Sequence, residues 1–343
     1  LSAYAGGAHV NLEGVATPFG SGTTNDRAAV VWATAATVVG SVAAVFLART
    51  LLKSFSGKGL VDDALVLLPE YGAAVALGAG LTVLAATKIG MPISTTHGLV
   101  GALVGAGWAA GSTIHFDRLG AKFFLPLLIS PILAVAVTAL LYPLLRFARR
   151  SLGVTQSTCF CVGSRVVDLA PAMPHTEAAL RTQMLSATTG DTVTCHNTYQ
   201  GQVLGIDAAT SLDRLHFLSA GAVCLARGLN DTPKIAAMLL LLPALPMAAG
   251  TAIVAVAIAL GGWFSARRVA ETMSHRITPM NHGQGFTANL ITSVIVIGAS
   301  RWGLPVSTTH VSCGSLFGVG AATGAGHWPL STPILGAWPV TLP

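Results

Sequence analysis

One stretch of this chain occurs twice, and this repeat limits most strongly what the chain can fold into. Residues Gly90–Gly107 read GMPISTTHGLVGALVGAG, and residues Gly303–Gly320 read GLPVSTTHVSCGSLFGVG. The two copies share Gly, Pro, Ser, Thr, Thr and His in one order, with a constant offset of 213 residues from Ser94 to Ser307. A repeat at this period is far longer than a solenoid unit, so it predicts two related halves.

Each copy predicts a break between two helices. Proline lacks an amide donor and restricts the residue before it, so a helix that reaches Gly-x-Pro must end there. Interrupted backbone at membrane depth is tolerated only where protein or a polar cavity surrounds it, which makes each PxSTTH a candidate broken-helix tip at a binding site. Successive hydroxyl groups at a helix N-terminus can donate to an anion, and the helix dipole adds about 0.3–1 kcal/mol. A tetrahedral oxyanion fits these donors.

The composition indicates a membrane protein. Of the 343 residues, 52% are hydrophobic and 9% are charged, against about 25% charged residues in soluble domains. The net charge of +6 lies largely in loops, and no basic stripe with interleaved aromatic residues is present, so we expect no nucleic-acid binding. We predict an all-α polytopic protein that crosses the lipid bilayer of the plasma (inner) membrane several times.

The five cysteines give no clear framework. They include Cys159-Phe-Cys161 in a polar stretch and Cys224 and Cys313 in apolar runs. This pattern matches neither a paired disulfide framework nor a zinc site, so we expect the CxC pair to be ordinary loop residues and predict no metal site.

Changes in polarity along the chain suggest four segments. Polarity rises sharply after the basic run Arg146, Arg149 and Arg150 and falls again near Leu215. In the second half the region after the motif has only begun at Pro333, so its last span is expected to be truncated. The predicted segments are 1–112, the first repeat core; 113–150, scaffold membrane span(s); 151–214, an extramembrane loop; and 215–343, the second repeat.

A second element carries charge inside otherwise apolar sequence. Asn230 and Asp231 lie at the junction of two hydrophobic runs, in ARGLNDTPK. A charge at membrane depth costs about 2.5–3.5 kcal/mol, so such a residue is expected to be functional. The alternative is a loop aspartate that caps a helix whose first turn holds Pro233. The first half has a comparable interruption in AHVNLEGVAT, and this pairing favours the functional interpretation.

These motifs resemble those of the inorganic phosphate transporter (PiT) family. The resemblance rests on the two GxPxSTTH motifs and on LARGLNDTPKIAA, ARRVAETMSHRI and GQGFTANL, and covers nearly all of the chain outside 151–213. It implies two inverted-topology repeats with broken or re-entrant helices, and import of phosphate together with sodium ions or protons. It implies no cofactor and no enzymatic activity, and leaves room for a homodimer.

The resemblance also implies a set of site residues. The family's first Asn-Asp pair would fall at His9-Val10, so this chain departs from the pattern and has one carboxylate where a symmetric site would have two. The coupling-ion candidates are Asp231, Asn230, Asn11, Thr96 and Thr309, with Glu13 as a further substitute if the register shifts. The implied phosphate-binding residues are Ser94, Thr95, Thr96, Ser307, Thr308, Thr309, Asn230 and Asp231.

Each of the charged or titratable side chains around the site has two interpretations. Asp231 could accept a hydrogen bond from protonated phosphate or could hold a cation. His97 and His310 are proton-relay candidates, although a histidine that bonds to a carbonyl of its own turn is the more common outcome. Lys88 and Arg301 precede the two motifs at equal spacing, and we interpret them as snorkelling side chains rather than anion attractors.

Three other functions stay open. A membrane enzyme would need a serine held by a base and an orienting acid, but Ser94 and His97 lie at i, i+3 without that acid, in two copies. An anion channel would carry flux that does not depend on a cation gradient. A transporter of another oxyanion, such as sulfate, is the closest alternative.

Overall fold

The structure of the protein is a computed structural model that describes residues 1–10, 14–91, 93–169, 180–198, 203–241, 246–265, 280–326 and 336. The chain forms two compact units. The first unit comprises Leu1–Pro143 and His216–Pro343, and the second comprises Leu144–Leu215.

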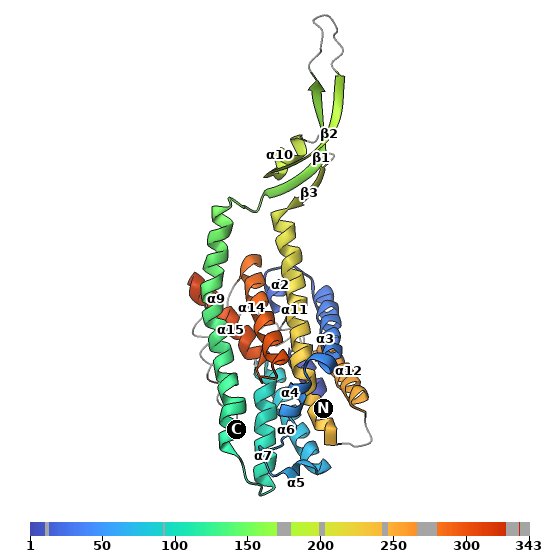
Figure 1. Ribbon diagram of the computed structural model, residues 1–343, viewed down its shortest axis with the longest axis vertical. Helices are drawn as coiled ribbons and strands as arrows, with labels where there is room; N and C mark the ends of the chain where they lie inside the picture. The colour runs from blue at the N-terminus through green and yellow to red at the C-terminus, as the bar shows by residue number, and fades with distance from the viewer. Residues whose placement is uncertain are drawn as a thin grey trace, which may run out of the picture. The chain divides into compact units, whose positions relative to one another are not determined.

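The first unit is helical, and its helices lie side by side (Figure 1). Two helices pass from one unit to the other, namely α9 (Leu125–Ser151) and α11 (Ala208–Ala236). The remaining helices are α1 (Ser2–Val10), α2 (Ala16–Gly20), α3 (Asp26–Leu47), α4 (Arg49–Ser54), α5 (Asp63–Val66), α6 (Pro69–Ile89), α7 (Thr95–Ala109), α8 (Phe116–Leu119), η1 (Gly120–Phe124), η2 (Ala237–Leu241), α12 (Met247–Ser265), α14 (His282–Arg301) and α15 (Thr308–Thr323).

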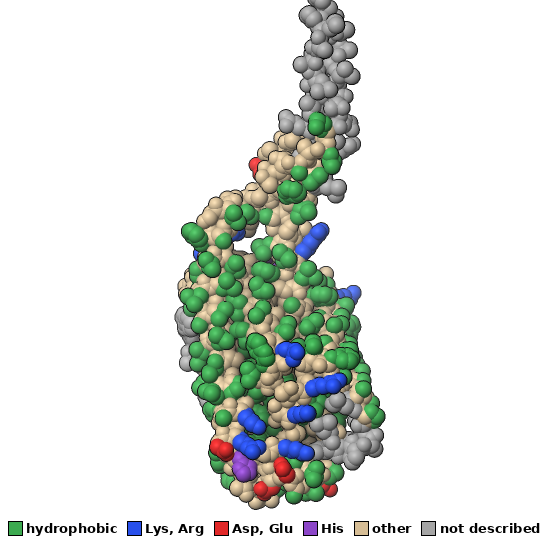
Figure 2. Space-filling view, viewed as in Figure 1, with side chains coloured by type: hydrophobic (Ala, Val, Ile, Leu, Met, Phe, Trp, Pro, Cys, Tyr) green, Lys and Arg blue, Asp and Glu red, His purple; other side chains and the backbone are tan. Residues whose placement is uncertain are grey.

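Three helical stretches in the described part of the chain are long and apolar enough to cross a membrane. They are Arg27–Leu47, Pro69–Ile89 and Phe116–Ser151, and a shorter apolar helix covers Ala248–Phe264. Large hydrophobic side chains are exposed on them, for example Phe46, which is 70% exposed. Figure 2 shows hydrophobic side chains over most of the visible face of this unit, with charged side chains gathered toward one end. This distribution suits a surface that contacts lipid.

Both motif copies form the helix break that the sequence predicts. The first break separates α6 from α7 and the second separates α14 from α15. Gly90 and Gly303 each have φ of 72°, a left-handed conformation that glycine adopts without steric cost. The residue after each glycine donates its N–H to a carbonyl five residues earlier, at 3.0 Å from Met91 to Ala86 and 2.9 Å from Leu304 to Ala299. This is the hydrogen bond of a Schellman helix end, so the same local structure occurs twice.

Close packing between helices depends on small residues. A Cβ on Gly228 of α11 would lie 2.2 Å from the Thr37 carbonyl oxygen, and a Cβ on Gly40 of α3 would lie 2.1 Å from the Leu225 carbonyl oxygen. Any larger residue would therefore separate α3 from α11. This contact keeps the polar end of α11 against α3, where Thr232 donates a 2.7 Å hydrogen bond to Ser41.

The second unit corrects the prediction that the chain is all-α. The sequence predicts a loop over residues 151–214, but this segment contains three strands and a short helix, β1 (Thr158–Leu169), β2 (Leu180–Asp191), β3 (Val203–Asp207) and α10 (Thr192–Thr198). The strands form an antiparallel sheet in the order β2-β1-β3. Threonine, valine and cysteine favour strands, but the polar background of the segment hid this preference. Its position outside the membrane stays a prediction.

Two aspartates start helices at the ends of strands in this segment. The Thr194 side chain and backbone N–H lower the pKa of Asp191, and the Thr210 N–H lowers the pKa of Asp207. Each carboxylate accepts a backbone N–H at 2.6 Å. Both residues are N-caps, which satisfy amide groups that the first turn of a helix leaves free.

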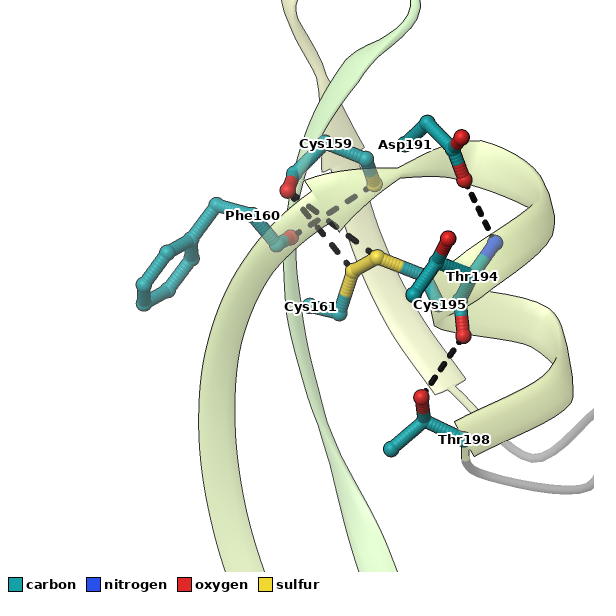
Figure 3. Close-up of a disulfide and its surroundings, with 7 residues drawn as sticks. All are labelled: Cys159, Phe160, Cys161, Asp191, Thr194, Cys195 and Thr198. Atoms are coloured by element: carbon teal, nitrogen blue, oxygen red, sulfur yellow. Dashed lines mark hydrogen bonds between the residues drawn. A yellow bond between two sulfur atoms is a disulfide. The ribbon is translucent and has the colours of Figure 1, made fainter.

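The prediction that the cysteines form no disulfide is wrong. Cys161 pairs with Cys195 across 34 residues, with the thiol of Cys159 beside them (Figure 3). Residues 159 and 161 lie on the same face of β1 because side chains alternate along a strand, and α10 places Cys195 over that face. The three sulfur atoms lie within 4.8 Å of one another and are buried. A separation of 34 residues gave no sequence signal for this pairing.

Several predicted features lie outside the described residues. Asn11, Glu13 and Pro92 are among them, as is the stretch after Ala325 and Gly326 that holds the predicted truncated span, except for residue 336. The predicted boundaries at 112 and 150, and the inverted topology of the repeats, also stay predictions.

Candidate functional site

The two breaks meet inside the first unit. The rings of His97 and His310 lie 4.5 Å apart between centroids, and both side chains are buried. The Thr96 hydroxyl of the first break donates a 3.1 Å hydrogen bond to the Val306 carbonyl oxygen of the second. The structure therefore brings together two stretches that are 210 residues apart, in the interior of the helical unit.

The two serines cap the helices that follow the breaks. Ser94 Oγ accepts the His97 N–H at 2.9 Å, and Ser307 Oγ accepts the His310 N–H at 3.2 Å. Both serines are buried, with exposed fractions of 0% and 1%. An N-cap serine satisfies an amide in the first turn, so each hydroxyl contributes to the local fold, and its proton stays available for another acceptor.

Helix α11 brings a run of buried polar side chains to the breaks. Arg227, Asn230, Asp231 and Lys234 are each at most 5% exposed. They lie at i, i+3, i+4 and i+7, which is one face of a helix. The helix is continuous from Ala208 to Ala236 with Pro233 inside it, so the alternative in which Asp231 caps a new helix is wrong.

The Val306 carbonyl oxygen is the central acceptor of the site. It accepts hydrogen bonds from Thr96 Oγ1 at 3.1 Å, from Asn230 Nδ2 at 3.2 Å and from Lys234 Nζ at 2.7 Å. This carbonyl lies just before the N-cap Ser307, where the helix break frees it from intrahelical bonding. One backbone oxygen thus connects both breaks to α11.

Asp231 accepts hydrogen bonds from three donors, two on α11 and one on α15. Its Oδ1 atom accepts from Asn230 Nδ2 at 3.0 Å and from Lys234 Nζ at 3.3 Å, and its Oδ2 atom accepts from Thr308 Oγ1 at 3.4 Å. A buried carboxylate is tolerated where a cation and hydrogen bonds compensate it, and both are present here.

In the first half, His9 of α1 connects the end of α6 to the residue before Ser94. Its Nδ1 atom lies 3.0 Å from Thr87 Oγ1, and its Nε2 atom lies 3.0 Å from Ile93 N and 3.1 Å from Ile93 O. Thr87 donates its hydroxyl proton to Val83 O, so it accepts from Nδ1–H. In a neutral ring, Nε2 then accepts the Ile93 N–H.

The second half repeats this connection with Asn230. Asn230 Nδ2 donates to Val306 O, and Asn230 Oδ1 accepts from Ser300 Oγ at 3.1 Å. Ser300 and Val306 lie 213 residues after Thr87 and Ile93, the offset between the motifs. His9 therefore occupies the position of Asn230 in the first half, and Val10 follows it where Asp231 follows Asn230.

A small cavity opens beside the charged residues. It is lined by Thr95 and Thr96 of α7, by Asp231 and Lys234 of α11, and by small or apolar residues of α1 and α6. A pocket with a few convergent polar groups is the usual form of a small-ligand site.

The predicted site residues fall into three groups. Thr96, Thr308, Asn230 and Asp231 are joined in one hydrogen-bond network. Thr95 lines the cavity. The others are the caps Ser94 and Ser307, the buried Thr309, His97 and His310, the exposed Lys88 and Arg301, and Asn11 outside the described residues.

Sequence reasoning missed three buried residues at this site, of which Lys234 belongs to the hydrogen-bond network. Lys234 and Arg227 share a helix face with Asp231, and ionisable residues in an apolar run are functional candidates, so their spacing could have identified them. His9 was noted only as a departure from the family pattern. Its contacts with Thr87 and Ile93 join residues 78 and 84 positions apart, which no local signal reveals.

Comparison with known proteins places this arrangement in a family. The sequence profile of the Phosphate transporter family matches residues 6–343. A Pyrococcus furiosus protein named as a phosphate permease is 27% identical over 99% of this chain and 90% of that protein. A Mycobacterium bovis protein, also named as a phosphate permease, is 44% identical over 26% of this chain, and the match spans 16% of that protein's length.

One solved structure has the same fold. The structure titled "The sodium-dependent phosphate transporter" matches with a TM-score of 0.70 and 21% identity, over 99% of this chain and 91% of that one. The family and these relatives are transporters and permeases, which confirms the expectation that the chain is not an enzyme, and they indicate no cofactor. The match over residues 6–343 means that this chain is a membrane protein of the phosphate transporter family, as the resemblance of its motifs to the PiT family predicted.

Proposed function

We propose that this protein moves inorganic phosphate across the membrane at the junction of its two helix breaks. The observation that carries the proposal is the hydrogen-bond network in which Thr96, Thr308 and the Asn230–Asp231 pair meet in the buried interior. The family membership supports the identity of the substrate.

The buried charges on α11 suit an anion. Arg227 and Lys234 carry two positive charges against the single negative charge of Asp231, all on one buried face of α11. Hydrogen bonds to a charged group contribute about 1.5–3 kcal/mol each, so hydroxyl groups from both breaks could replace the hydration shell of phosphate. Asp231 would accept a hydrogen bond from a protonated phosphate oxygen, which sulfate lacks at neutral pH.

Uptake needs a driving ion. Drawing one negative charge into a cell against an inside-negative potential of 100 mV costs about 2.3 kcal/mol, so co-transported cations must supply more than this. Sodium ions or protons are the candidates. We propose an alternating-access cycle in the plasma membrane, in which two inverted-topology repeats rock around the junction.

The test is uptake of radiolabelled phosphate into proteoliposomes that hold the full-length protein, with and without a sodium or pH gradient. We expect saturable uptake above the equilibrium level only when a cation gradient is present. Uptake that never exceeds equilibrium would indicate a channel, and stronger inhibition by sulfate than by unlabelled phosphate would indicate a different oxyanion as substrate.

Site variants test the residues. Ser94→Ala and Ser307→Ala each remove a hydroxyl from a break, and we expect each to lower the affinity for phosphate by about tenfold. Ser54→Ala is the matched control, because Ser54 bonds only to the Thr50 carbonyl of its own helix in the described structure. If both site variants transport like the control, the serines are caps alone. Crosslinking of the reconstituted protein tests whether it is a homodimer.

A further inference from the structure

We propose that the ammonium group of Lys234 is a built-in cation at the junction of the two breaks, and that it makes phosphate binding at this position independent of sodium. This inference rests on the proposed function. It concerns a residue that neither the motifs nor the resemblance singled out.

Lys234 Nζ donates to three oxygen atoms of three chemical types. Thr96 Oγ1 lies at 2.7 Å, the Val306 carbonyl oxygen at 2.7 Å, and Asp231 Oδ1 at 3.3 Å. A protonated lysine has three N–H donors and no acceptor, so three acceptors satisfy it completely. The side chain is 2% exposed, and the Phe55 ring lies 5.7 Å from Nζ, within range of a cation–π contact.

These three oxygen atoms are also the kind that bind a metal cation. Hard cations take carboxylate and carbonyl oxygens, and in transporters with broken helices the freed backbone carbonyls coordinate the coupling ion. The acceptors here come from the first break, the second break and α11. A cation among them holds all three elements together, and Lys234 supplies that cation from within the chain.

The lone pairs of the three oxygens are already directed at donors. Thr96 donates its own proton to Val306 O, so its oxygen faces Lys234 as an acceptor. Val306 O accepts two further hydrogen bonds, from Thr96 and Asn230. A sodium ion at this point would have to displace an ammonium group that is covalently attached and cannot diffuse away.

A fixed cation changes how the site works. Lys234 can neutralise Asp231 and attract phosphate in every cycle, but it carries no charge across the membrane. A sodium gradient therefore does no work through this position, and the energy for uptake must enter through protons or through a cation bound elsewhere. In the second half this cation follows Asn230 by four positions, whereas the residue four positions after His9 in the first half is Glu13, so the sequence places no lysine there.

The experiment measures phosphate binding to the purified full-length protein by calorimetry, in sodium chloride and in choline chloride of equal ionic strength. For the wild type we expect affinities that differ by less than about threefold between the two salts. Lys234→Ala should bind phosphate about tenfold or more weakly in choline, and should recover part of that affinity when sodium or methylammonium is added.

Two further variants separate charge from packing. Lys234→Met keeps most of the side-chain volume without the charge and should lose affinity in choline as Lys234→Ala does. Lys53→Ala removes an exposed lysine of α4 and should bind like the wild type. If either Lys234 variant does not fold, the wild-type comparison of the two salts still decides the matter.

The outcomes distinguish this inference from the proposed function. A wild type that binds phosphate only with sodium would overturn the inference and leave phosphate transport intact, as would a Lys234→Ala protein whose affinity is unchanged in choline. A wild type that binds no phosphate in either salt would overturn both.

Discussion

The two halves of the site hold their helix breaks at the same position but with different hydrogen-bond roles and different charge. His9 Nε2 accepts the Ile93 N–H in the first half, whereas Asn230 Nδ2 donates to the Val306 carbonyl in the second, and both contacts lie at the residue before the N-cap serine. Beyond this point the halves diverge. The second half adds Asp231 and its partner Lys234, whereas the first half has Val10 after its histidine.

This difference separates what the fold needs from what the substrate needs. The glycine turn, the proline, the cap and the polar contact to the backbone occur twice, so they build the break itself. Among the described residues at the junction, the buried charged side chains lie on α11. One ion pair can serve both breaks because the Val306 carbonyl and Thr96 bring them within reach of the same lysine.

Replacing Asp231 by alanine should have the largest effect, because it removes the carboxylate that distinguishes the second half of the site from the first. Lys234 would stay buried without its carboxylate partner, and breaking a buried ion pair costs about 3–5 kcal/mol. We expect a lower unfolding temperature in detergent and loss of phosphate uptake. Asp117→Ala changes an exposed aspartate and is the control. Unchanged stability and uptake in Asp231→Ala would show that the second half does not depend on its charge.

A comparison of His9→Ala with Asn230→Ala tests whether the two connecting residues are equivalent. Without His9, the Ile93 N–H loses its acceptor in the interior, at a cost of about 1–3 kcal/mol. Without Asn230, the Val306 carbonyl keeps Thr96 and Lys234 as donors, so the loss should be smaller. Thermal unfolding of both variants measures the difference. Equal losses of stability would contradict the idea that Thr96 and Lys234 compensate for the missing Asn230. His9→Asn should restore part of the stability that His9→Ala loses.

Alanine at the two glycine turns should give the smallest effect. A left-handed conformation costs a residue with a Cβ about 1–2 kcal/mol, and this applies to Gly90 and Gly303 alike because both have φ of 72°. At Gly303 the added Cβ would also lie 2.6 Å from Thr50 Cγ2, so Gly303→Ala should be the more destabilising. Unfolding temperatures rank the two variants. If Gly303→Ala is less destabilising than Gly90→Ala, Thr50 has moved away from the added Cβ.

The parts of the site whose local structure depends on residues adjacent in the sequence could be predicted. Gly-x-Pro followed by serine contains both the stop of one helix and the cap of the next, and both breaks form as expected. Asp231 was recognisable because it is a charge in an apolar run. The strands of residues 158–207 were not predicted, because the pairing of β1 with both neighbours, and of Cys161 with Cys195, joins distant positions.

The sequence by itself determined the membrane class, the two helix breaks and the family, since these follow from composition, from backbone restrictions at glycine and proline, and from ordered motifs. Only the tertiary structure decided that Lys234 reaches both breaks and that the Val306 carbonyl joins them. Every residue has a backbone carbonyl oxygen, so the residue type at position 306 does not reveal this role. The contact of Lys234 with Thr96 spans 138 positions, so it exists only after the helices have packed together.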